Sequence, residues 1–524
     1  MKRLVKFFGG LPLAPFGLPV LVSGPIWANN IMRLAFEDLL PIMLTMLGIT
    51  ALLLIAIRLF AKGWARASLI TMIWVGYSLY LPALVRFFTT SDIVLIIALI
   101  LGALFAFDIS RRVPKEAEAA AKANSFANLA LVIPALVTLV SLGSQQADLE
   151  RGRPDPQQTF KPFPAQADKD SPDVWHIVMD RYAGSRILNS AYDHDNRKFL
   201  GELRKRGFNV ADDAYSNYQI TPLSLASTLN ASYLDDYAKA AGRQDDLVTM
   251  FYAIDRNRAF DFFKSNGYEI IFSGSWADVT VNNSQADRDI NYRGASEVPR
   301  IALLHSVPGS VGQMLGLPYT NGRMDQCQRV KHKFAKLTGV ANEPQQKFVF
   351  AHFLVPHPPY VLAADGTCQT EQDMSDLTRK AAYSGMVQYA NRELLKLIDA
   401  IQAGPRAATI ILHADEGPYP ARYAFDEPAF PADPEDGKHF FNLGPEIRRE
   451  KTSIIMAVHH ADAAQIEAPR TSVNLYPQIL NHSFGADMPI RKDRVMMFPA
   501  TIDMSKLKDF AGELLDKPAD QSAD

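Results

Sequence analysis

Two adjacent carboxylates follow an apolar run in the second half of the chain. The segment TIILHADEGP places Asp415 and Glu416 directly after strand-like residues and before Gly-Pro. Neighbouring carboxylates repel each other unless a cation lies beside them, and their oxygens suit Mn, Mg or Zn. The pattern predicts a divalent metal site. The alternative is a solvated turn, because Asp, Glu, Gly and Pro all favour turns.

A third carboxylate and a hydroxyl occupy comparable positions. Asp180 ends the apolar run of DVWHIVMD, and Thr221 precedes Pro222 in SNYQITPLSLASTLN. Either residue could serve only as a helix N-cap. A hydroxyl at a helix N-terminus also lies where anions are attracted and where a metal would lower its pKa. The functional interpretation is a cation held by Asp180, Asp415 and Glu416 beside a Thr221 hydroxyl that could act as a nucleophile, and the N-cap interpretation stays open for Asp180 and Thr221.

The elements that would position these residues alternate between strands and helices. Because the two alternate, they indicate an α/β domain with a mainly parallel sheet. Sites in such sheets lie beyond the carboxyl ends of the strands. Asp180, His357 (in FLVPHPPY) and Asp415 each follow a strand-like run. His357 could donate to a phosphate oxygen, or it could be a loop histidine packed between prolines. The strand-like runs are 174–179, 269–272, 348–354, 409–412 and 453–458, with helical patterns at 196–206 and 377–401.

The first part of the chain is apolar enough to span a membrane. A spanning helix needs about 20 mostly apolar residues. We predict five such helices, and prolines inside them are tolerable because neighbouring helices satisfy the freed backbone groups. The first could instead be a cleaved signal peptide, but its prolines and large residues fit cleavage poorly. The expected helices are 8–27, 39–60, 67–85, 93–110 and 126–142.

Loop charges orient these helices. Basic residues gather at the N-terminus and in the second and fourth loops, and the intervening loops are poor in base. Basic loops face the cytoplasm, so the N-terminus is expected to be cytoplasmic and the soluble part periplasmic in a bacterial inner membrane. The expected division is a transmembrane region at 1–143, an extended linker at 144–171, a soluble domain at 172–500 and a polar tail at 501–524.

Composition narrows the functional classes. The net charge is −2 and no Lys/Arg cluster is interleaved with aromatics, so nucleic-acid binding is not expected. The predicted membrane helices carry no pair of charges that would mark a transport path, so we interpret them as an anchor in the lipid bilayer. The two cysteines, Cys327 and Cys368, are either a disulfide, which a periplasmic location permits, or two separate thiols.

The order of four segments resembles a known superfamily. Strand-Asp180, SNYQITPLSLASTLN, HFLVPHPPY and HADEGP together look like the sulfatase/alkaline phosphatase superfamily. The similarity is greatest to its membrane-anchored branch, which includes lipoteichoic acid synthases and phosphoethanolamine transferases. The segments LPLAPFGLPVLVSGPIWANN and TSVNLYPQILNHSFGADMPIRKDR also resemble bacterial membrane sulfatase-like proteins. The resemblance implies an alkaline phosphatase-like fold for the soluble domain.

The resemblance also implies roles for matching residues. Asp180 and Asp415 fall at metal-ligand positions, Thr221 at the nucleophile and His357 at a substrate-phosphate histidine. His439, in DGKHFFN, is a second candidate for binding substrate, and a surface histidine is the alternative. The implied activity is that of a metal-dependent phosphotransferase or phosphodiesterase. Its expected substrate is a lipid-linked or glycan phosphate of the cell envelope.

Two positions depart from the superfamily pattern. Glu416 stands where the family has a metal-binding histidine, and Arg181 stands where a glycine follows the first aspartate. A glutamate adds negative charge and favours a harder ion. The Cys or Ser nucleophile motif of true sulfatases is absent, which argues against sulfate-ester hydrolysis. The alternative function is a catalytically inactive binding protein of the envelope, in which Arg181 replaces the metal as the partner of a carboxylate.

Overall fold

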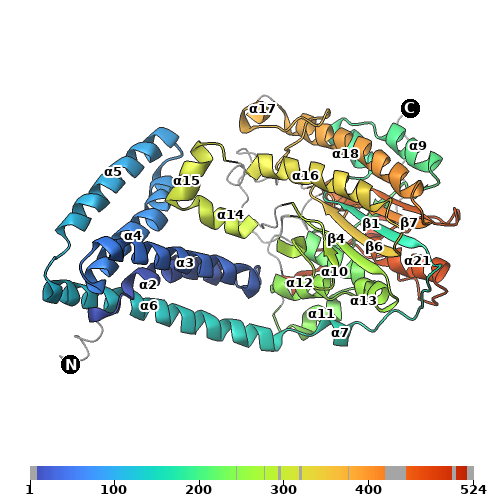
Figure 1. The fold of residues 1–524 in the computed structure, drawn as a ribbon. Helices are drawn as coiled ribbons and strands as arrows, with labels where there is room; N and C mark the ends of the chain where they lie inside the picture. The colour runs from blue at the N-terminus through green and yellow to red at the C-terminus, as the bar shows by residue number, and fades with distance from the viewer. Residues whose placement is uncertain are drawn as a thin grey trace. The chain divides into compact units, whose positions relative to one another are not determined.

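The computed structural model describes residues 9–243, 245–275, 278–292, 297–317, 322–375, 377–418, 444–498 and 503–515. The chain forms two compact units (Figure 1). The membrane unit comprises Met1–Gly152 and Ala295–Gly322, and the soluble unit comprises Arg153–Gly294 and Arg323–Asp524. The membrane unit therefore takes in a segment, 295–322, that the sequence interpretation assigned to the soluble domain.

The membrane unit is built from long apolar helices. Four helices in the described residues are long and apolar enough to cross a membrane, and they match four of the five predicted spans. The remaining one, α2, has only 17 residues because the chain is not helical at 11–13, around Pro12, and the helix restarts with Pro15 in its first turn. The helices are α2 (Ala14–Asn30), α3 (Phe36–Phe60), α4 (Trp64–Phe88), α5 (Asp92–Arg112) and α6 (Ala117–Gly152).

The last of these helices is longer than predicted. The sequence interpretation ended it at residue 142 and began an extended linker at 144, whereas α6 continues to Gly152. Residues 145–150 are mostly Gln, Ala, Leu and Glu, which favour helix, and Pro154 disfavours its continuation. A short helix, α7 (Pro156–Thr159), follows.

Helices α2 and α6 pack closely through small and polar residues. A side chain at Gly17 would lie 2.8 Å from the backbone oxygen of Leu131, so only glycine allows this approach. Asn128 receives a hydrogen bond from the Ala14 amide at 2.7 Å and donates to the Leu11 carbonyl at 2.8 Å. These contacts satisfy the backbone where α2 begins, in an environment that offers little water.

The soluble unit is organised by a seven-stranded sheet with the strand order β2-β9-β7-β1-β6-β4-β5. The central strands β7, β1, β6 and β4 run parallel, while β9 pairs antiparallel with β7 and β2 pairs antiparallel with β9. This confirms the predicted α/β class with a mainly parallel sheet. The strands are β1 (Asp173–Met179), β2 (Asn209–Val210), β4 (Glu269–Ser273), β5 (Arg288–Asp289), β6 (Lys347–Phe353), β7 (Ala408–His413) and β9 (Met456–His459).

The core lies between this sheet and its helices. Strands β1, β6 and β7 are buried along their whole length, as expected for parallel strands covered on both faces. Small two-stranded sheets, β3–β8 (Ala214–Tyr215, Ser453–Ile454) and β10–β11 (Met496–Met497, Lys508–Asp509), complete the unit. The helices are α8 (Ser185–Tyr192), α9 (Arg197–Lys205), α10 (Thr221–Asn230), α11 (Asp235–Ala240), α12 (Leu247–Asp255), α13 (Arg258–Ser265), α16 (Gly322–Val340), α17 (Glu371–Ser375), α18 (Arg379–Gln402), α20 (Pro445–Thr452), α21 (Leu475–Ser483) and α22 (Ala511–Leu514).

One covalent cross-link joins two parts of the soluble unit. Cys327 of α16 and Cys368, in the segment after β6, form a disulfide with a Cα–Cα distance of 5.7 Å. The pairing decides between the two alternatives that the sequence left open. It ties α16 to the segment that follows the site loop containing His357.

Candidate active site

Three neighbouring strands bring their carboxyl ends together at the candidate site. Strand β1 lies between β6 and β7, and Val178 is level with His352 on one side and with His413 on the other. Asp180 directly follows β1, His352 is the penultimate residue of β6, and Asp415 follows β7 after one intervening residue. The parallel arrangement therefore delivers two carboxylates and one imidazole to one edge of the sheet.

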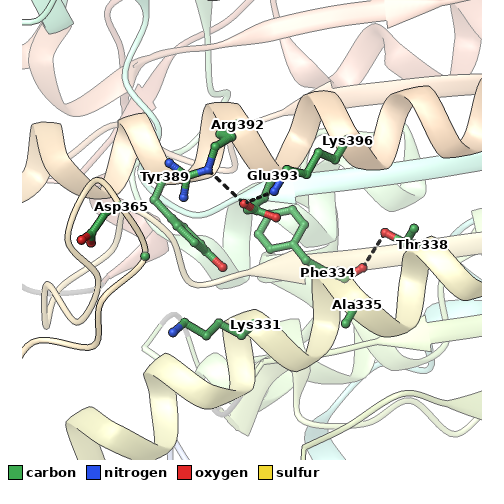
Figure 2. Close-up of a pocket in the computed structure, with 10 residues that line it drawn as sticks. Lys331, Phe334, Ala335, Thr338, Asp365, Tyr389, Arg392, Glu393 and Lys396 are labelled. Atoms are coloured by element: carbon green, nitrogen blue, oxygen red, sulfur yellow. Dashed lines mark hydrogen bonds and ion pairs between the residues drawn. The ribbon is translucent and has the colours of Figure 1, made fainter.

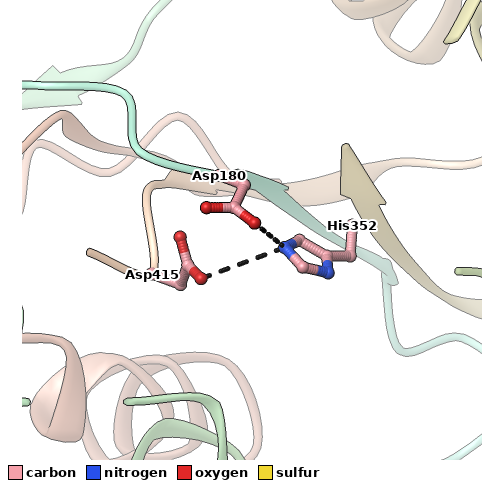
Figure 3. Close-up of side chains that lie close together, drawn as sticks. All are labelled: Asp180, His352 and Asp415. Carbon is pink, nitrogen blue, oxygen red and sulfur yellow. Dashed lines mark ion pairs between the residues drawn. The ribbon is translucent and has the colours of Figure 1, made fainter. Parts of the chain in front are cut away.

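These three side chains, the Asp–His–Asp group, point toward a common centre (Figure 3). The Nε2 atom of His352 lies 3.5 Å from Oδ2 of Asp180 and 4.0 Å from Oδ2 of Asp415. One ligand atom from each residue lies within 4.8 Å of the others, and all three residues are buried. Two oxygens and one imidazole nitrogen form a donor set that suits Zn or Mn, with coordination positions left over for substrate or water.

Each residue of this group has one buried side-chain atom that has no hydrogen-bond partner among the described residues. They are Oδ1 of Asp180, Nε2 of His352 and Oδ2 of Asp415. Buried polar atoms are nearly always paired, so three unpaired acceptors at one point indicate a missing positive group. The donor set and the unpaired atoms therefore fit a divalent cation, and these three residues would hold it.

Burial makes the two carboxylates costly to ionise without a cation. Burial, together with the charge of the adjacent Asp180 carboxylate, raises the pKa of Asp415 to about 7. Burial likewise raises the pKa of Asp180 to about 7, against the lowering effect of the Arg181 charge. Burial lowers the pKa of His352 to about 4, which keeps its imidazole neutral and able to bind a metal.

The orientation of His352 is fixed by hydroxyls on the opposite side of its ring. Its Nδ1 lies 2.8 Å from Oγ1 of Thr280, and that oxygen lies 2.6 Å from Oγ of Ser275. If Nδ1 donates to Thr280, the lone pair of Nε2 faces Asp180 and Asp415. Such an outer hydrogen bond typically sets the tautomer of a metal-binding histidine.

Glu416 lies in a different electrostatic setting from its neighbour Asp415. Its Oε1 lies 2.8 Å from Nε of Arg181, and its Oε2 lies 2.8 Å from Nζ of Lys451. Lys451 is fully buried and also donates to the Gly417 carbonyl at 2.9 Å. The protein thus supplies two cations for Glu416, which we call the Arg–Glu–Lys group. Glu416 was predicted as a metal ligand, and the structure places it among these cations, outside the Asp–His–Asp group.

Arg181 connects the two groups through an unusual backbone. Its φ is 60°, in the left-handed region that favours glycine, which is the residue that the resemblance implied here. Its amide donates to Oδ1 of Asp415 at 3.4 Å while its guanidinium holds Glu416. A strained residue at a site is retained when surrounding contacts outweigh the cost.

Thr221 is the first residue of α10 and lies beside the Asp–His–Asp group. Its side chain interacts with the Asp415 carboxylate and lowers the pKa of that group, although burial raises it more. Pro222 occupies the first turn of the helix, where a missing N–H costs nothing. The structure therefore brings together Asp180, Asp415 and Thr221, residues that are far apart in the sequence.

The two histidines predicted to bind substrate differ in what the structure shows of them. His357 lies in the loop after β6, where burial, with help from the charges of Arg181 and Lys451, holds its pKa well below the usual value. Its Nδ1 contacts the Pro358 carbonyl. His357 thus lies near both charged groups of the site. His439 lies outside the described residues.

A chain of buried hydrogen bonds links α21, β1 and β7 next to the site. Nδ1 of His176 lies 2.8 Å from the Tyr476 hydroxyl, and its Nε2 lies 2.7 Å from Nε2 of His413. Nδ1 of His413 lies 2.7 Å from the Ala414 carbonyl. Burial lowers the pKa of both histidines, so the chain is neutral. It fixes the backbone from which Asp415 projects.

Sequence reasoning missed three residues that the structure brings to the site. His352 was treated as part of an apolar strand, although a histidine near the end of the strand FVFAHF is a polar exception in a buried run. Thr280 and Lys451 carry no local signal, because each is an ordinary residue that becomes important through its partner. Only tertiary contacts reveal their roles.

The soluble unit also has a polar hollow of about 460 Å³ between α16, α18 and the loop at Asp365 (Figure 2). Its cations are Lys331, Arg392 and Lys396. Glu393 accepts from Arg392 at 3.2 Å and from Lys396 at 2.9 Å. Two of the three cations are thus already paired, so we assign no ligand to this hollow.

A mostly parallel sheet with a buried Asp–His–Asp group at the strands' carboxyl ends agrees with the alkaline phosphatase-like fold that the resemblance implied. The family model named Sulfatase matches residues 172–486, more than half of the chain, so the chain belongs to the sulfatase family. Together with its apolar helices, this places it in the membrane-anchored branch of the superfamily, as the resemblance implied. No curated protein matches the chain.

Solved structures of related fold include envelope proteins. The periplasmic domain of EptC from Escherichia coli is 12% identical, covering 68% of this chain and 98% of that one, with a TM-score of 0.44. The same domain in complex with Zn is 11% identical, covering 68% of this chain and 100% of that one, with a TM-score of 0.43. The integral membrane lipooligosaccharide phosphoethanolamine transferase A (EptA) from Neisseria meningitidis is 14% identical, covering 90% of this chain and 83% of that one, with a TM-score of 0.39.

Proposed function

We propose that the protein is a membrane-anchored, metal-dependent phosphotransferase or phosphodiesterase that acts on a phosphate ester of the periplasmic cell envelope. The observation that carries the proposal is the convergence of three unpaired ligand atoms, from Asp180, His352 and Asp415, beside the hydroxyl of Thr221. A metal bound there would neutralise both carboxylates, polarise a phosphoryl oxygen and lower the pKa of a nearby hydroxyl.

The residues of the chain suggest a covalent route. The Thr221 oxygen attacks phosphorus as its proton passes to the Asp415 carboxylate, and the bond from phosphorus to the ester oxygen breaks as that oxygen takes this proton from Asp415 and leaves as an alcohol. Water or an acceptor hydroxyl then attacks the phosphothreonine and gives its proton to Asp415, which passes it to the Thr221 oxygen as the bond from that oxygen to phosphorus breaks. His357 and Arg181 contribute donors or positive charge close to the phosphoryl oxygens.

The nucleophile proposed here is a threonine, which favours phosphate over sulfate esters as substrates. True sulfatases carry a Cys or Ser motif at this position, and this sequence has Thr221 in QITPLS. The apolar helices confine the enzyme to a bilayer, where a lipid-linked donor is available at high local concentration. A lipid-linked or glycan phosphate is therefore the proposed substrate class.

Thr221→Ala tests the nucleophile. We expect turnover of bis-p-nitrophenyl phosphate to fall by at least roughly 10³-fold, as for other lost nucleophiles, while metal content measured by elemental analysis stays at the wild-type level. Thr159→Ala, at an exposed helical threonine of the linker, is the matched control and should keep full activity. Acid quenching followed by mass spectrometry should detect phosphothreonine at position 221 in the wild type.

Two outcomes would overturn the proposal. Equal turnover in wild type and Thr221→Ala would remove the threonine route, and turnover of p-nitrophenyl sulfate but not of phosphate esters would remove the substrate class. A purified protein with neither metal nor turnover would favour the alternative, an envelope binding protein. The pairing of Glu416 with Arg181 and Lys451, which needs no ion, is the observation consistent with that alternative.

A further inference from the structure

The segment 295–322 belongs to the membrane unit although soluble-unit sequence flanks it on both sides. It forms two short helices, α14 (Glu297–Leu304) and α15 (Val307–Met314), which pack against α3 and α4 respectively (Figure 1). We call this pair the α14–α15 hairpin. Both of its contacts are with helices that are apolar and long enough to span a membrane.

The turn of the hairpin is tight, and its polar groups form hydrogen bonds with one another. Ser306 caps α15, accepting from the Gly309 amide at 3.3 Å and donating to the Leu303 carbonyl at 2.6 Å. A side chain at Gly309 would collide with the Leu303 carbonyl, 1.9 Å away, so the turn requires glycine. Such a satisfied turn suits an environment that offers few hydrogen bonds.

The composition of the hairpin also suits lipid. From 302 to 317 the sequence ALLHSVPGSVGQMLGL contains no Asp, Glu, Lys or Arg, and the two charged residues of the hairpin, Glu297 and Arg300, stand in the first half of α14. Several of its apolar side chains point outward: Val311 is 39% exposed, Leu315 70% and Leu317 50%. Exposed apolar side chains beside spanning helices mark a surface that contacts the bilayer rather than water.

An apolar groove of about 420 Å³ lies between the hairpin, α3 and α4. Its wall includes Ile49 of α3, Trp74 of α4, and Leu303 and Pro308 of the hairpin, and none of the residues that line it is charged. The hydroxyls of two lining threonines are occupied within α3: Thr45 donates to the Pro41 carbonyl at 2.7 Å and Thr50 to the Met46 carbonyl at 2.8 Å. An occupant therefore gains contact with apolar groups and little hydrogen bonding.

We propose that the α14–α15 hairpin enters the bilayer and that its groove with α3 and α4 binds an acyl chain of a membrane phospholipid. The groove volume falls in the range of roughly 300–1,000 Å³ usual for small-molecule sites. The surrounding medium decides the occupant: Ile49, which lines the groove, is 61% exposed on a spanning helix, so the groove opens to hydrocarbon. A chain that enters it restores the dispersion contacts that an empty groove would forfeit.

The proposal rests on the membrane unit alone and not on the chemistry of the Asp–His–Asp group. Its test uses the full-length protein in nanodiscs of phosphatidylethanolamine and phosphatidylglycerol, doped with phosphatidylethanolamine that carries a diazirine in one acyl chain. Irradiation followed by mass spectrometry maps the labelled peptides. We expect labels on the 302–308 peptide and on α3 near Ile49. The labelling is read without turnover, so it fails or succeeds independently of the proposed reaction.

Two exposed positions of α3 provide a matched pair. Ile49→Trp fills the groove, whereas Leu52→Trp places the same bulk at a residue that is 69% exposed and does not line the groove. We expect Ile49→Trp to reduce labelling of the 302–308 peptide by roughly tenfold, because a filled groove excludes the chain, and Leu52→Trp to leave it unchanged. Thr45→Phe, at another exposed lining position, should repeat the effect.

The result that would overturn the proposal is equal labelling of 302–308 in the wild type and in both groove-filling variants. Absence of label from 302–317 while α3 is labelled around Leu52 would also overturn it, because it would show that the hairpin lies outside the bilayer.

Discussion

Asp415 and Glu416 are adjacent in sequence, yet their carboxylates belong to two regions with opposite charge balance. In the Asp–His–Asp group, one oxygen of each carboxylate and the Nε2 of His352 are buried with no hydrogen-bond partner among the described residues, and no Lys or Arg of those residues forms an ion pair with either carboxylate. In the Arg–Glu–Lys group, Glu416 lies 2.8 Å from each of two cationic side chains. The charge of Glu416 is compensated by cationic side chains of the described residues, whereas the Asp–His–Asp group needs a positive charge from solution.

This difference indicates what each region does. Breaking a buried ion pair is costly because it leaves an uncompensated charge, so the Arg–Glu–Lys group stabilises the segment after β7 without help from solution. The Asp–His–Asp group carries the opposite cost in the free protein, and the binding of a cation removes it. Metal binding and local stability are therefore linked in one half of the site and independent in the other.

The largest expected effect comes from removing a ligand of the Asp–His–Asp group. Asp415→Asn should weaken binding of Zn or Mn by at least about 100-fold, since even outer-shell changes cost 10–100-fold. Isothermal titration of the metal-free protein measures this affinity. The matched control is Asp487→Asn, an exposed carboxyl that should leave the affinity unchanged. Wild-type affinity in Asp415→Asn would contradict the assignment of Asp415 as a ligand.

A second effect appears in the pH dependence of stability. Burial raises the folded pKa of Asp180 and Asp415 to about 7 from ordinary values of 3.8. Their contribution to stability is therefore fully present below the unfolded pKa and is lost as pH rises through about 7. For the EDTA-treated protein we expect this loss to lower the melting temperature between pH 4 and 7.5, and added Zn or Mn to restore it above pH 7.

The double variant Asp180→Asn/Asp415→Asn isolates this contribution from all other titrating groups. Subtracting its melting temperatures from those of the metal-free wild type should give a difference that declines as pH rises from 4 to 7.5. A difference that stays constant over that interval would show that the two carboxyls do not titrate as their burial requires.

The smallest effect on metal binding is expected at Glu416. Glu416→Gln should keep one bound metal and an affinity within a few-fold of wild type, because the carboxylate is already paired with Arg181 and Lys451. The same change should lower the free energy of unfolding by about 3–5 kcal/mol, the usual cost of breaking a buried pair. Titration and denaturant melts measure the two quantities. Loss of the metal would instead show that Glu416 is a ligand, as the sequence suggested.

Local patterns in the sequence were sufficient to predict the architecture. Apolar run length predicted five spanning helices, four of which match spans in the described residues, and the alternation of short apolar runs with helical patterns predicted the α/β class. Where prediction failed, the competing factor was also local: Pro12 and Pro15 shortened the first helix, and helix-forming residues extended α6 into the expected linker. These outcomes depend on neighbours along the chain.

Some residues of the site could be predicted from the sequence, whereas the roles of others became visible only in the tertiary structure. Asp180, Thr221 and Asp415 could be proposed from strand ends and a helix start, because parallel strands deliver their carboxyl ends to one edge. The function of Glu416 could not be inferred in this way, since its cations, Arg181 and Lys451, lie 235 and 35 positions away in the sequence. His352 was hidden inside an apolar strand for the same reason.

The sequence by itself determined which residues were able to bind a metal or attack a phosphate, because side-chain chemistry and hydrophobic period are local properties. Only the tertiary structure decided which carboxylates are neutralised by the protein and which lack a partner. Charge compensation is a property of three-dimensional distance, and it depends on residues that no local pattern connects.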